Sequence, residues 1–247
     1  ANSTARSTAP SPTSSLDGLS PAPLRVGRRA YSLYKGLSLA TCRSMSLPSS
    51  PTASSPHLGM EALVHSARKQ PALPDGTCKN FYFLRHGQTA RNAARIFQDR
   101  SEPLDAAGQQ QASTAAHRLG HEPIRSIVGS DVLRASQTAD TVARQLGLPW
   151  TVHTGLRERH FGALIGTSSV NLDWACAPTG GETLVDFVQR TCAGVALALA
   201  HPAPVLLVAH GGNLLVLAAW LGGALPPGAL GNAQPLHFTH AQGRWHI

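Results

Sequence analysis

Two histidines of this chain stand in the same local pattern. His86 follows an apolar run at 81–84 and one arginine, and His210 follows an apolar run at 205–209; a glycine comes directly after each histidine. Such runs predict strands buried on both faces. Open α/β sheets bind ligands beyond the carboxyl ends of their strands. Both imidazoles are therefore candidates for chemistry at that edge of a sheet.

Cationic side chains accompany these histidines. Arg85 directly precedes the first one, and Arg134 follows a third apolar run, 126–129, in the first turn of an expected helix. A cation is disfavoured there, because a helix N-terminus already carries a partial positive charge. A bound anion would relieve this conflict; the alternative is a solvated surface arginine. A helix start after His86, with Thr89 as its N-cap, would add N–H groups that suit an anion.

Strands and helices alternate along the chain. Strands are expected at 81–84, 126–129, 150–152 and 205–209, with an edge hairpin from 236–239 and 244–247. Helices are expected at 106–119, from a start within 130–139 to about 146, and from 184 to about 200. Asp105 is a suitable N-cap for the first long helix. This alternation predicts an α/β domain with a largely parallel sheet.

Charge and hydropathy exclude two classes of partner. Residues 1–80 hold nine Lys and Arg residues against three acidic ones, so most of the net charge of +8 lies there. The remainder is nearly balanced, which does not support nucleic-acid binding. The most apolar region, 205–225, is interrupted by His-Gly-Gly-Asn and predicts a core strand plus a helix, without a membrane segment.

The N-terminal segment differs in composition from the rest. Residues 1–59 are rich in Ser, Pro, Ala and Thr with Asp17 as their only acid, which predicts disorder. The segment fits either an organellar transit peptide or a non-functional extension upstream of a start near Met60. Residues 60–78 are expected to be a linker, and 79–247 the folded domain. A cytoplasmic location is expected, or an organellar one if 1–59 is a transit peptide.

Two other chemistries use residues of the same region. His86, His210 and Glu158 could form a two-histidine, one-carboxylate metal site. Two arginines in the same pocket argue against a bound cation, and none of these three residues belongs to an H-x-x-x-H or D-x-D motif, so no metal is expected. Cys176 and Cys192 are possible thiol nucleophiles, but neither lies in a glycine loop that could cradle a phosphate.

Seven motifs in order, across residues 79–215, resemble the histidine phosphatase superfamily, the phosphoglycerate-mutase-like enzymes. They are Arg85-His86-Gly87-x-Thr89-x-x-Asn92, Gln98, Pro103-Leu104 with Gly108 and Gln111-Ala112, Ser130-x-x-x-Arg134-Ala135-x-x-Thr138-Ala139, Glu158-x-x-Phe161-Gly162-x-x-x-Gly166, Gly180-Gly181-Glu182, and His210-Gly211-Gly212. The resemblance implies a three-layer αβα sandwich. Asp99, where a glycine is usual, and a 100–103 stretch one residue short depart from the pattern and affect the expected substrate choice.

The resemblance also implies a mechanism. His86 would attack phosphorus as a neutral imidazole and form a phosphohistidine. Arg85, Arg134 and His210 would surround the phosphoryl oxygens. Glu158 would protonate the leaving oxygen and then accept a proton from water.

The resemblance extends to the substrate-binding set, which would be Asn92, Gln98, Arg159 and Gly211. Asn92 and Gln98 would donate to the phosphoryl group, and Arg159, for which a solvated side chain is the alternative, would contact the rest of the substrate. The substrate would be a small phosphorylated metabolite, and no cofactor is expected.

Hydrolase and mutase activities are distinguished by one segment. The sequence of residues 158–164 resembles that of cofactor-dependent mutases. Those enzymes, however, carry a long insertion over the site, and residues 166–180 are too few to build such a lid. An uncovered site admits water, so a phosphomonoesterase is predicted. The alternatives are a phosphoglycerate mutase and, in another class, a non-catalytic phospho-ligand-binding domain.

Overall fold

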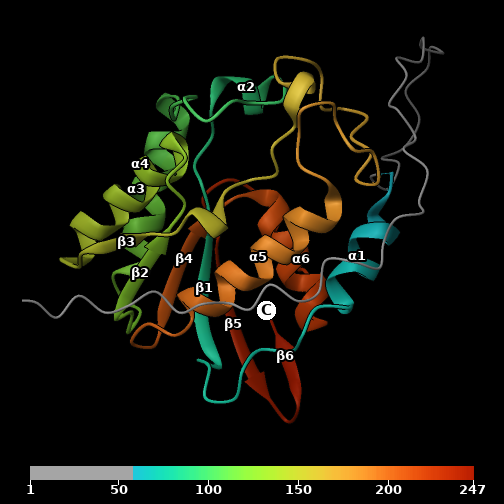
Figure 1. The fold of residues 1–247 in the computed structure, drawn as a ribbon. Helices are drawn as coiled ribbons and strands as arrows, with labels where there is room; N and C mark the ends of the chain where they lie inside the picture. Colours follow the sequence, from blue (N-terminus) through green and yellow to red (C-terminus); the bar gives the residue numbers. More distant parts are fainter. Residues whose placement is uncertain (1–57) are drawn as a thin grey trace, which may run out of the picture. The chain divides into compact units, whose positions relative to one another are not determined.

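A six-stranded sheet forms the centre of the fold (Figure 1). The structure is a computed structural model and describes residues 58–247. The strand order is β3 (Trp150–Val152), β2 (Ser126–Gly129), β4 (Val205–Ala209), β1 (Asn80–Arg85), β5 (Pro235–Ala241) and β6 (Arg244–His246). The first four strands are parallel, and β5 and β6 add an antiparallel hairpin at the edge. The predicted α/β class with a mostly parallel sheet is confirmed.

Helices cover both faces of this sheet. Helices α3 (Ala106–Leu119) and α4 (Leu133–Leu146) pack on one face, and α5 (Leu184–Ala198) and α6 (Gly211–Leu221) pack on the other (Figure 1). Along β1, Tyr82 and Leu84 face the first pair while Phe81 and Phe83 face the second, as the two-residue period of a strand requires. The result is the expected αβα sandwich.

The register of the parallel strands sets the position of the two histidines. Arg85 pairs with Ala209 and Gly129 pairs with Val208. The N–H of His86 donates to the Ala209 carbonyl at 3.0 Å, just beyond the ends of both strands. His86 and His210 therefore leave adjacent strands at the same edge, although 124 positions separate them in the sequence.

The loop after β1 lies very close to the start of α3. A Cβ on Gly87 would lie 2.4 Å from the carbonyl oxygen of Gly108, and one on Gly108 would lie 2.0 Å from that of Gln88. Only glycine at both positions permits this approach. The Asp105 carboxylate accepts from the Gly108 N–H at 2.7 Å and caps α3, as expected from the sequence.

The linker expected at 60–78 is wrong over its first half. Residues 60–68 form a helix, α1 (Met60–Arg68), which buries Leu63 and Ala67 against Phe187 of α5 and Val216 of α6. Only two turns and two buried positions carry this amphipathic pattern, which is too short a window for periodicity to identify. The expectations for residues 1–57 lie outside the described residues.

Three short elements complete the described chain: α2 (Ala90–Ala93), η1 (Thr154–Leu156) and η2 (Gly162–Leu164). Thr89 caps α2 by accepting from the Asn92 N–H at 3.0 Å, as predicted. Over residues 58–247, none of the helices combines the length and the apolar character needed to span a bilayer.

Candidate active site

His86 is held as a neutral imidazole with one nitrogen available. Its side chain is 3% exposed, and its Nδ1 lies 2.7 Å from the carbonyl oxygen of Gly87. That contact assigns the ring proton to Nδ1, which leaves Nε2 unprotonated and able to accept a hydrogen bond. Arg134 Nε donates to this Nε2 at 3.3 Å. Burial, and then the charges of Arg134 and Arg85, hold the pKa of His86 well below 6.5.

Two guanidinium groups stand beside His86, that of the buried Arg134 and that of the partly buried Arg85. Arg134 is 4% exposed, and its Nη1 donates to the Asp99 carbonyl at 2.8 Å. Arg85 donates through Nη1 to the Leu230 carbonyl. Neither forms an ion pair with an acidic residue of the described chain. Burial lowers the pKa of Arg134 to about 10, against the opposing effect of Glu158. Two largely desolvated cations that form no ion pair there favour a bound anion, although the nearby Glu158 carboxylate offsets part of their charge.

His210 approaches His86 from the neighbouring strand. The two ring centroids are 5.1 Å apart, and His210 Nε2 lies 3.0 Å from the hydroxyl of Ser130. Burial, and then the charge of Arg134, hold its pKa well below 6.5. Ser130 follows β2, so the ends of three parallel strands contribute to this cluster.

Some buried polar atoms near this cluster lack a protein partner. Within residues 58–247 they are Arg85 Nε, His210 Nδ1 and Trp174 Nε1. Buried polar groups are nearly always hydrogen-bonded. A phosphoryl group between Arg85 and His210 could accept from both, which would explain why the protein supplies no partner of its own.

Glu158 is fixed at the N-terminus of α6. Its Oε1 accepts from the N–H of Arg159 at 2.9 Å, and its Oε2 accepts from the N–H of Gly212 at 3.0 Å. A Cβ on Gly212 would lie 2.2 Å from Glu158 Oε1. The second glycine of the His-Gly-Gly motif is therefore required for the carboxylate to approach the helix so closely.

A cavity of about 310 Å³ joins these groups. Eight of the nine residues expected at the site meet here. His210 packs against His86, and the cavity is lined by Arg85, His86, Asn92, Gln98, Arg134, Glu158 and Gly211. Thr89 donates to the Gln98 side-chain oxygen at 2.7 Å, which turns the amide nitrogen of Gln98 away from Thr89.

Arg159 is the exception, and the expected substrate contact is revised. Its side chain is only 2% exposed, and three of its nitrogens donate to the main-chain carbonyls of Glu182, Trp174 and Cys176 at 2.7 to 3.1 Å. It therefore holds two loops together. Its place directly after Glu158 in the sequence did not reveal that its guanidinium group binds three main-chain carbonyls.

The segment 166–180 contributes more than expected. It is short, but Ser169, Leu172 and Trp174 form part of the cavity wall, together with Phe97 and Leu215. The segment therefore contributes side chains to the wall of the site although it is too short for a long insertion. A tryptophan and a leucine within a polar stretch were the only available signal of this wall.

The alternative chemistries find no support in the described part of the chain. Burial raises the pKa of Cys192 to about 12, so this thiol on α5 is a poor nucleophile. Among residues 58–247, no three His, Cys, Asp or Glu side chains are grouped so that they could hold a metal ion.

Comparison with known proteins identifies the family. The profile of the histidine phosphatase superfamily (branch 1) matches residues 81–247. The glucosyl-3-phosphoglycerate phosphatase of Mycobacterium tuberculosis is 34% identical over 197 residues, which covers 68% of this chain and 86% of that protein. The probable phosphoglycerate mutase GpmB of Yersinia enterocolitica is 33% identical over 165 residues, or 60% of this chain and 76% of that one.

Solved structures agree with these relatives. The mycobacterial glucosyl-3-phosphoglycerate phosphatase in complex with VO3 superposes with a TM-score of 0.58 at 32% identity, covering 68% of this chain and 96% of that chain. The fold, the buried histidine cluster and the sequence relationships lead to the same conclusion: the chain belongs to the histidine phosphatase superfamily.

Proposed function

We propose that this chain hydrolyses phosphomonoesters through a phosphohistidine formed on His86. The observation that carries the proposal is the arrangement of one buried neutral imidazole, two guanidinium groups without carboxylate partners and one carboxylate around a single cavity. This arrangement suits a dianionic phosphoryl group better than any uncharged ligand.

In the first step, the lone pair of His86 Nε2 attacks phosphorus, and the bond from phosphorus to the ester oxygen breaks. The hydrogen bond from Nδ1 to the Gly87 carbonyl stabilises the positive charge that the ring acquires. Arg85 and Arg134 stabilise the charge on the phosphoryl oxygens. Glu158, in its protonated form, gives its proton to the departing oxygen.

In the second step, water replaces the alcohol. The Glu158 carboxylate takes a proton from the water, whose oxygen attacks phosphorus as the bond to Nε2 breaks. Inorganic phosphate leaves, and both His86 and Glu158 return to their starting protonation states. The arginines act in both steps, because the charge on the phosphoryl oxygens is similar in each transition state.

The substrate we propose is a small phosphorylated metabolite with a second anionic group. The cavity of about 310 Å³ has room for a molecule of that class. Arg95 also lines it, with no acidic partner among the described residues. The carboxylate of a phosphorylated acid would complement this arginine. The name of the mycobacterial relatives, glucosyl-3-phosphoglycerate phosphatase, is compatible with such a substrate.

A mutase is the second candidate, because some relatives carry the name probable phosphoglycerate mutase. The two activities separate when the protein is incubated with p-nitrophenyl phosphate and, in a second assay, with 3-phosphoglycerate plus bisphosphoglycerate. The expected result is phosphate release from the esters. Isomerisation of phosphoglycerate without phosphate release would replace hydrolysis by mutase activity.

His86→Ala distinguishes catalysis from simple binding of a phosphorylated ligand. Loss of the nucleophile should lower kcat by at least about a thousandfold, while binding of inorganic phosphate, measured by calorimetry, persists through Arg85 and Arg134. Rapid quenching of the wild-type enzyme during turnover in an alkaline denaturant, in which phosphohistidine is stable, should trap a phosphate label on His86. Turnover that survives the His86→Ala substitution would exclude this mechanism.

A chelator should leave the rate of phosphate release unchanged, because the proposed mechanism uses no metal ion.

A further inference from the structure

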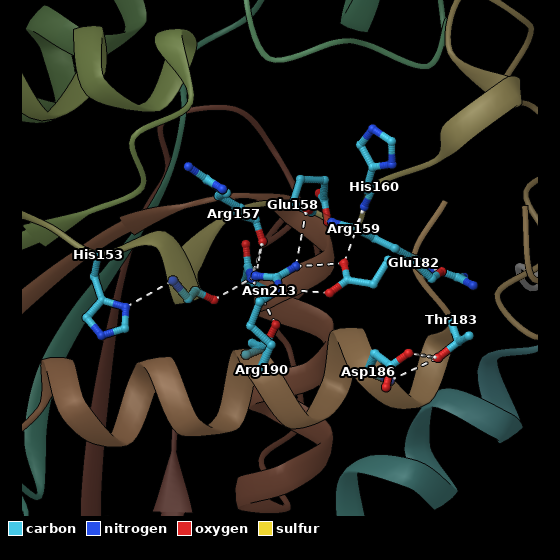
Figure 2. A network of polar contacts seen from close by, with 12 residues as sticks. His153, Arg157, Glu158, Arg159, His160, Glu182, Thr183, Asp186, Arg190 and Asn213 are labelled. Carbon is cyan, nitrogen blue, oxygen red and sulfur yellow. Dashed lines mark hydrogen bonds and ion pairs between the residues drawn. The ribbon is translucent and has the colours of Figure 1, made fainter. Parts of the chain in front are cut away.

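Arg190, on α5, lies outside the cavity but binds the segment that carries Glu158. Its Nη1 donates to the carbonyls of Gly155 at 2.9 Å and Arg157 at 3.0 Å, and its Nη2 lies 3.4 Å from that of Glu158 (Figure 2). One guanidinium thus contacts three main-chain oxygens within four residues. The third of them belongs to the proposed proton donor itself.

Glu182 fixes this guanidinium in place. Arg190 Nε donates to Glu182 Oε1 and Arg190 Nη2 donates to Glu182 Oε2, both at 2.8 Å (Figure 2). The main chain of Glu182 also donates to the His160 carbonyl at 2.8 Å. A two-point pair of this kind orients the guanidinium plane and neutralises its charge. The segment 155–160 is consequently bound at one end by Arg190 of α5 and at the other by Glu182, just before α5.

Asn213 connects the same segment to the second histidine. Its Nδ2 donates to the Arg157 carbonyl at 3.2 Å and to the Thr191 hydroxyl at 3.1 Å, and its Oδ1 accepts from the His210 N–H at 3.2 Å. Asn213 is fully buried. Movement of the Glu158 segment relative to His210 would therefore break hydrogen bonds in a buried, fully connected network, which is energetically costly.

From these contacts we infer that Arg190 and Glu182 are positioning residues for general-acid catalysis by Glu158. The inference rests on the proposed function, in which Glu158 protonates the leaving oxygen. Neither residue lines the His86 cavity. They act through the main chain at 155–158, which sets the distance from the Glu158 carboxyl to the ester oxygen. Displacement by about 1 Å can lower a rate by a factor of about 100.

Leaving-group dependence separates this role from a purely structural one. A p-nitrophenolate ion departs without a proton, whereas an alkoxide such as that of glycerol phosphate needs one. A misplaced acid therefore slows hydrolysis of glycerol phosphate and hardly affects p-nitrophenyl phosphate. Partial unfolding lowers both rates equally. The ratio of the two kcat/KM values, measured on one sample, is thus independent of the folded fraction.

The test compares this ratio in wild type, Arg190→Lys, Glu182→Gln and Glu158→Gln. Arg190→Lys keeps the charge but loses the planar fork, and Glu182→Gln keeps the size but weakens the pair. Both should lower kcat/KM for glycerol phosphate by about 10-fold or more, with less than about a threefold change for p-nitrophenyl phosphate. Arg144→Lys, at an exposed position on α4, is the matched control and should change neither.

Glu158→Gln shows how the ratio changes when the general acid is absent. It therefore separates the proposed role of Glu158 from the positioning role inferred for Arg190 and Glu182. If it lowers both rates equally, Glu158 is not the acid and the proposed function fails in that respect. If it changes the ratio while both positioning variants leave the ratio at the wild-type value, the inference is overturned and the mechanism stands. In the Glu158→Gln background, Arg190→Lys should produce no further change in the ratio, because the group it positions is already absent.

Discussion

At the scale of single residues, the site depends on keeping imidazoles neutral in a cationic environment. His86 and His210 are both buried, and the charge of Arg134 faces each of them. Burial and positive neighbours disfavour the same imidazolium form, so the two effects add. A neutral His86 keeps its lone pair for phosphorus, and a site already rich in positive charge needs no imidazolium to attract an anion.

This arrangement predicts a loss of stability in acid. Above about pH 6.5 both histidines are neutral in the folded and unfolded states and contribute nothing to pH dependence. Below that value the unfolded chain binds protons that the folded chain does not, so the free energy of unfolding falls by up to about 1.4 kcal/mol per pH unit for each histidine. Urea titrations at pH 7.5 and 5.5, in a buffer without phosphate, measure the effect.

The comparison for that experiment is the double variant His86→Asn/His210→Asn. It should lose clearly less stability than wild type between the two pH values, because the two titrating groups are gone. If both proteins lost the same free energy of unfolding between pH 7.5 and 5.5, the two histidines would titrate in the folded state as they do in the unfolded chain. Nε2 of His86 would then be protonated in acid and could not attack phosphorus.

Arg95 offers a second prediction at this scale. Its side chain is exposed and lines the cavity, so it should contact the second anionic group of the substrate. Arg95→Gln should raise KM by about 5- to 20-fold for a phosphate ester that also carries a carboxylate, and leave KM for p-nitrophenyl phosphate nearly unchanged. Equal effects on both substrates would place Arg95 at the phosphoryl group.

At the scale of elements, close backbone contacts decide where the catalytic side chains lie. The loop that carries His86 contacts the start of α3 through the close backbone approach of Gly87 and Gly108. The same loop is also held by Thr138 of α4, whose hydroxyl accepts a hydrogen bond from the Gly87 N–H at 3.1 Å. Two helices on one face of the sheet thus position the loop that carries the proposed nucleophile.

A methyl group at this contact should disturb both stability and activity. In Gly108→Ala the new Cβ would lie 2.0 Å from the Gln88 carbonyl oxygen, so the loop must move. The expected cost is about 1–3 kcal/mol in the free energy of unfolding, with a larger relative loss in kcat/KM. Gln109→Ala, the neighbouring exposed position on α3, should change neither by a measurable amount. An active, stable Gly108→Ala variant would show that the contact is looser than described.

At the scale of the whole described chain, the catalytic edge is supported by a part that lies outside the matched family region. Helix α1 precedes residue 81 and packs against α5 and α6. The same cluster contains Trp174, whose side chain lines the cavity. The main-chain N–H of Trp174 donates to the Leu58 carbonyl at 2.9 Å. The helix therefore supports one wall of the site from behind.

Removing the apolar contact of α1 tests this role. Leu63 is fully buried, so Leu63→Ala should lower the free energy of unfolding by about 2–5 kcal/mol. It should also raise KM, because Trp174 loses support. His65→Ala, an exposed position on the same helix, is the control. If both variants match wild type in urea titrations and KM, residues 60–68 behave as a linker after all.

The fold and most of the candidate site were predictable because their signals are local. Thr89 and Asp105 each cap a helix by a bond to the N–H three residues ahead, and buried strands are recognisable as apolar runs. Arg159 and Arg190 have the same side chain, yet nothing in the neighbouring sequence indicates which loop each would hold. Arg190 reaches carbonyls 32 to 35 residues away.

The sequence alone therefore determined which residue types follow each parallel strand, and with them the family, the αβα architecture and the groups that meet beyond the strand ends. The tertiary structure decided the tautomer of His86, the inward turn of Trp174, the use of Arg159 and the packing of α1. Those features depend on contacts between distant segments, and such contacts are set by the whole packed core, which no short stretch of residues contains.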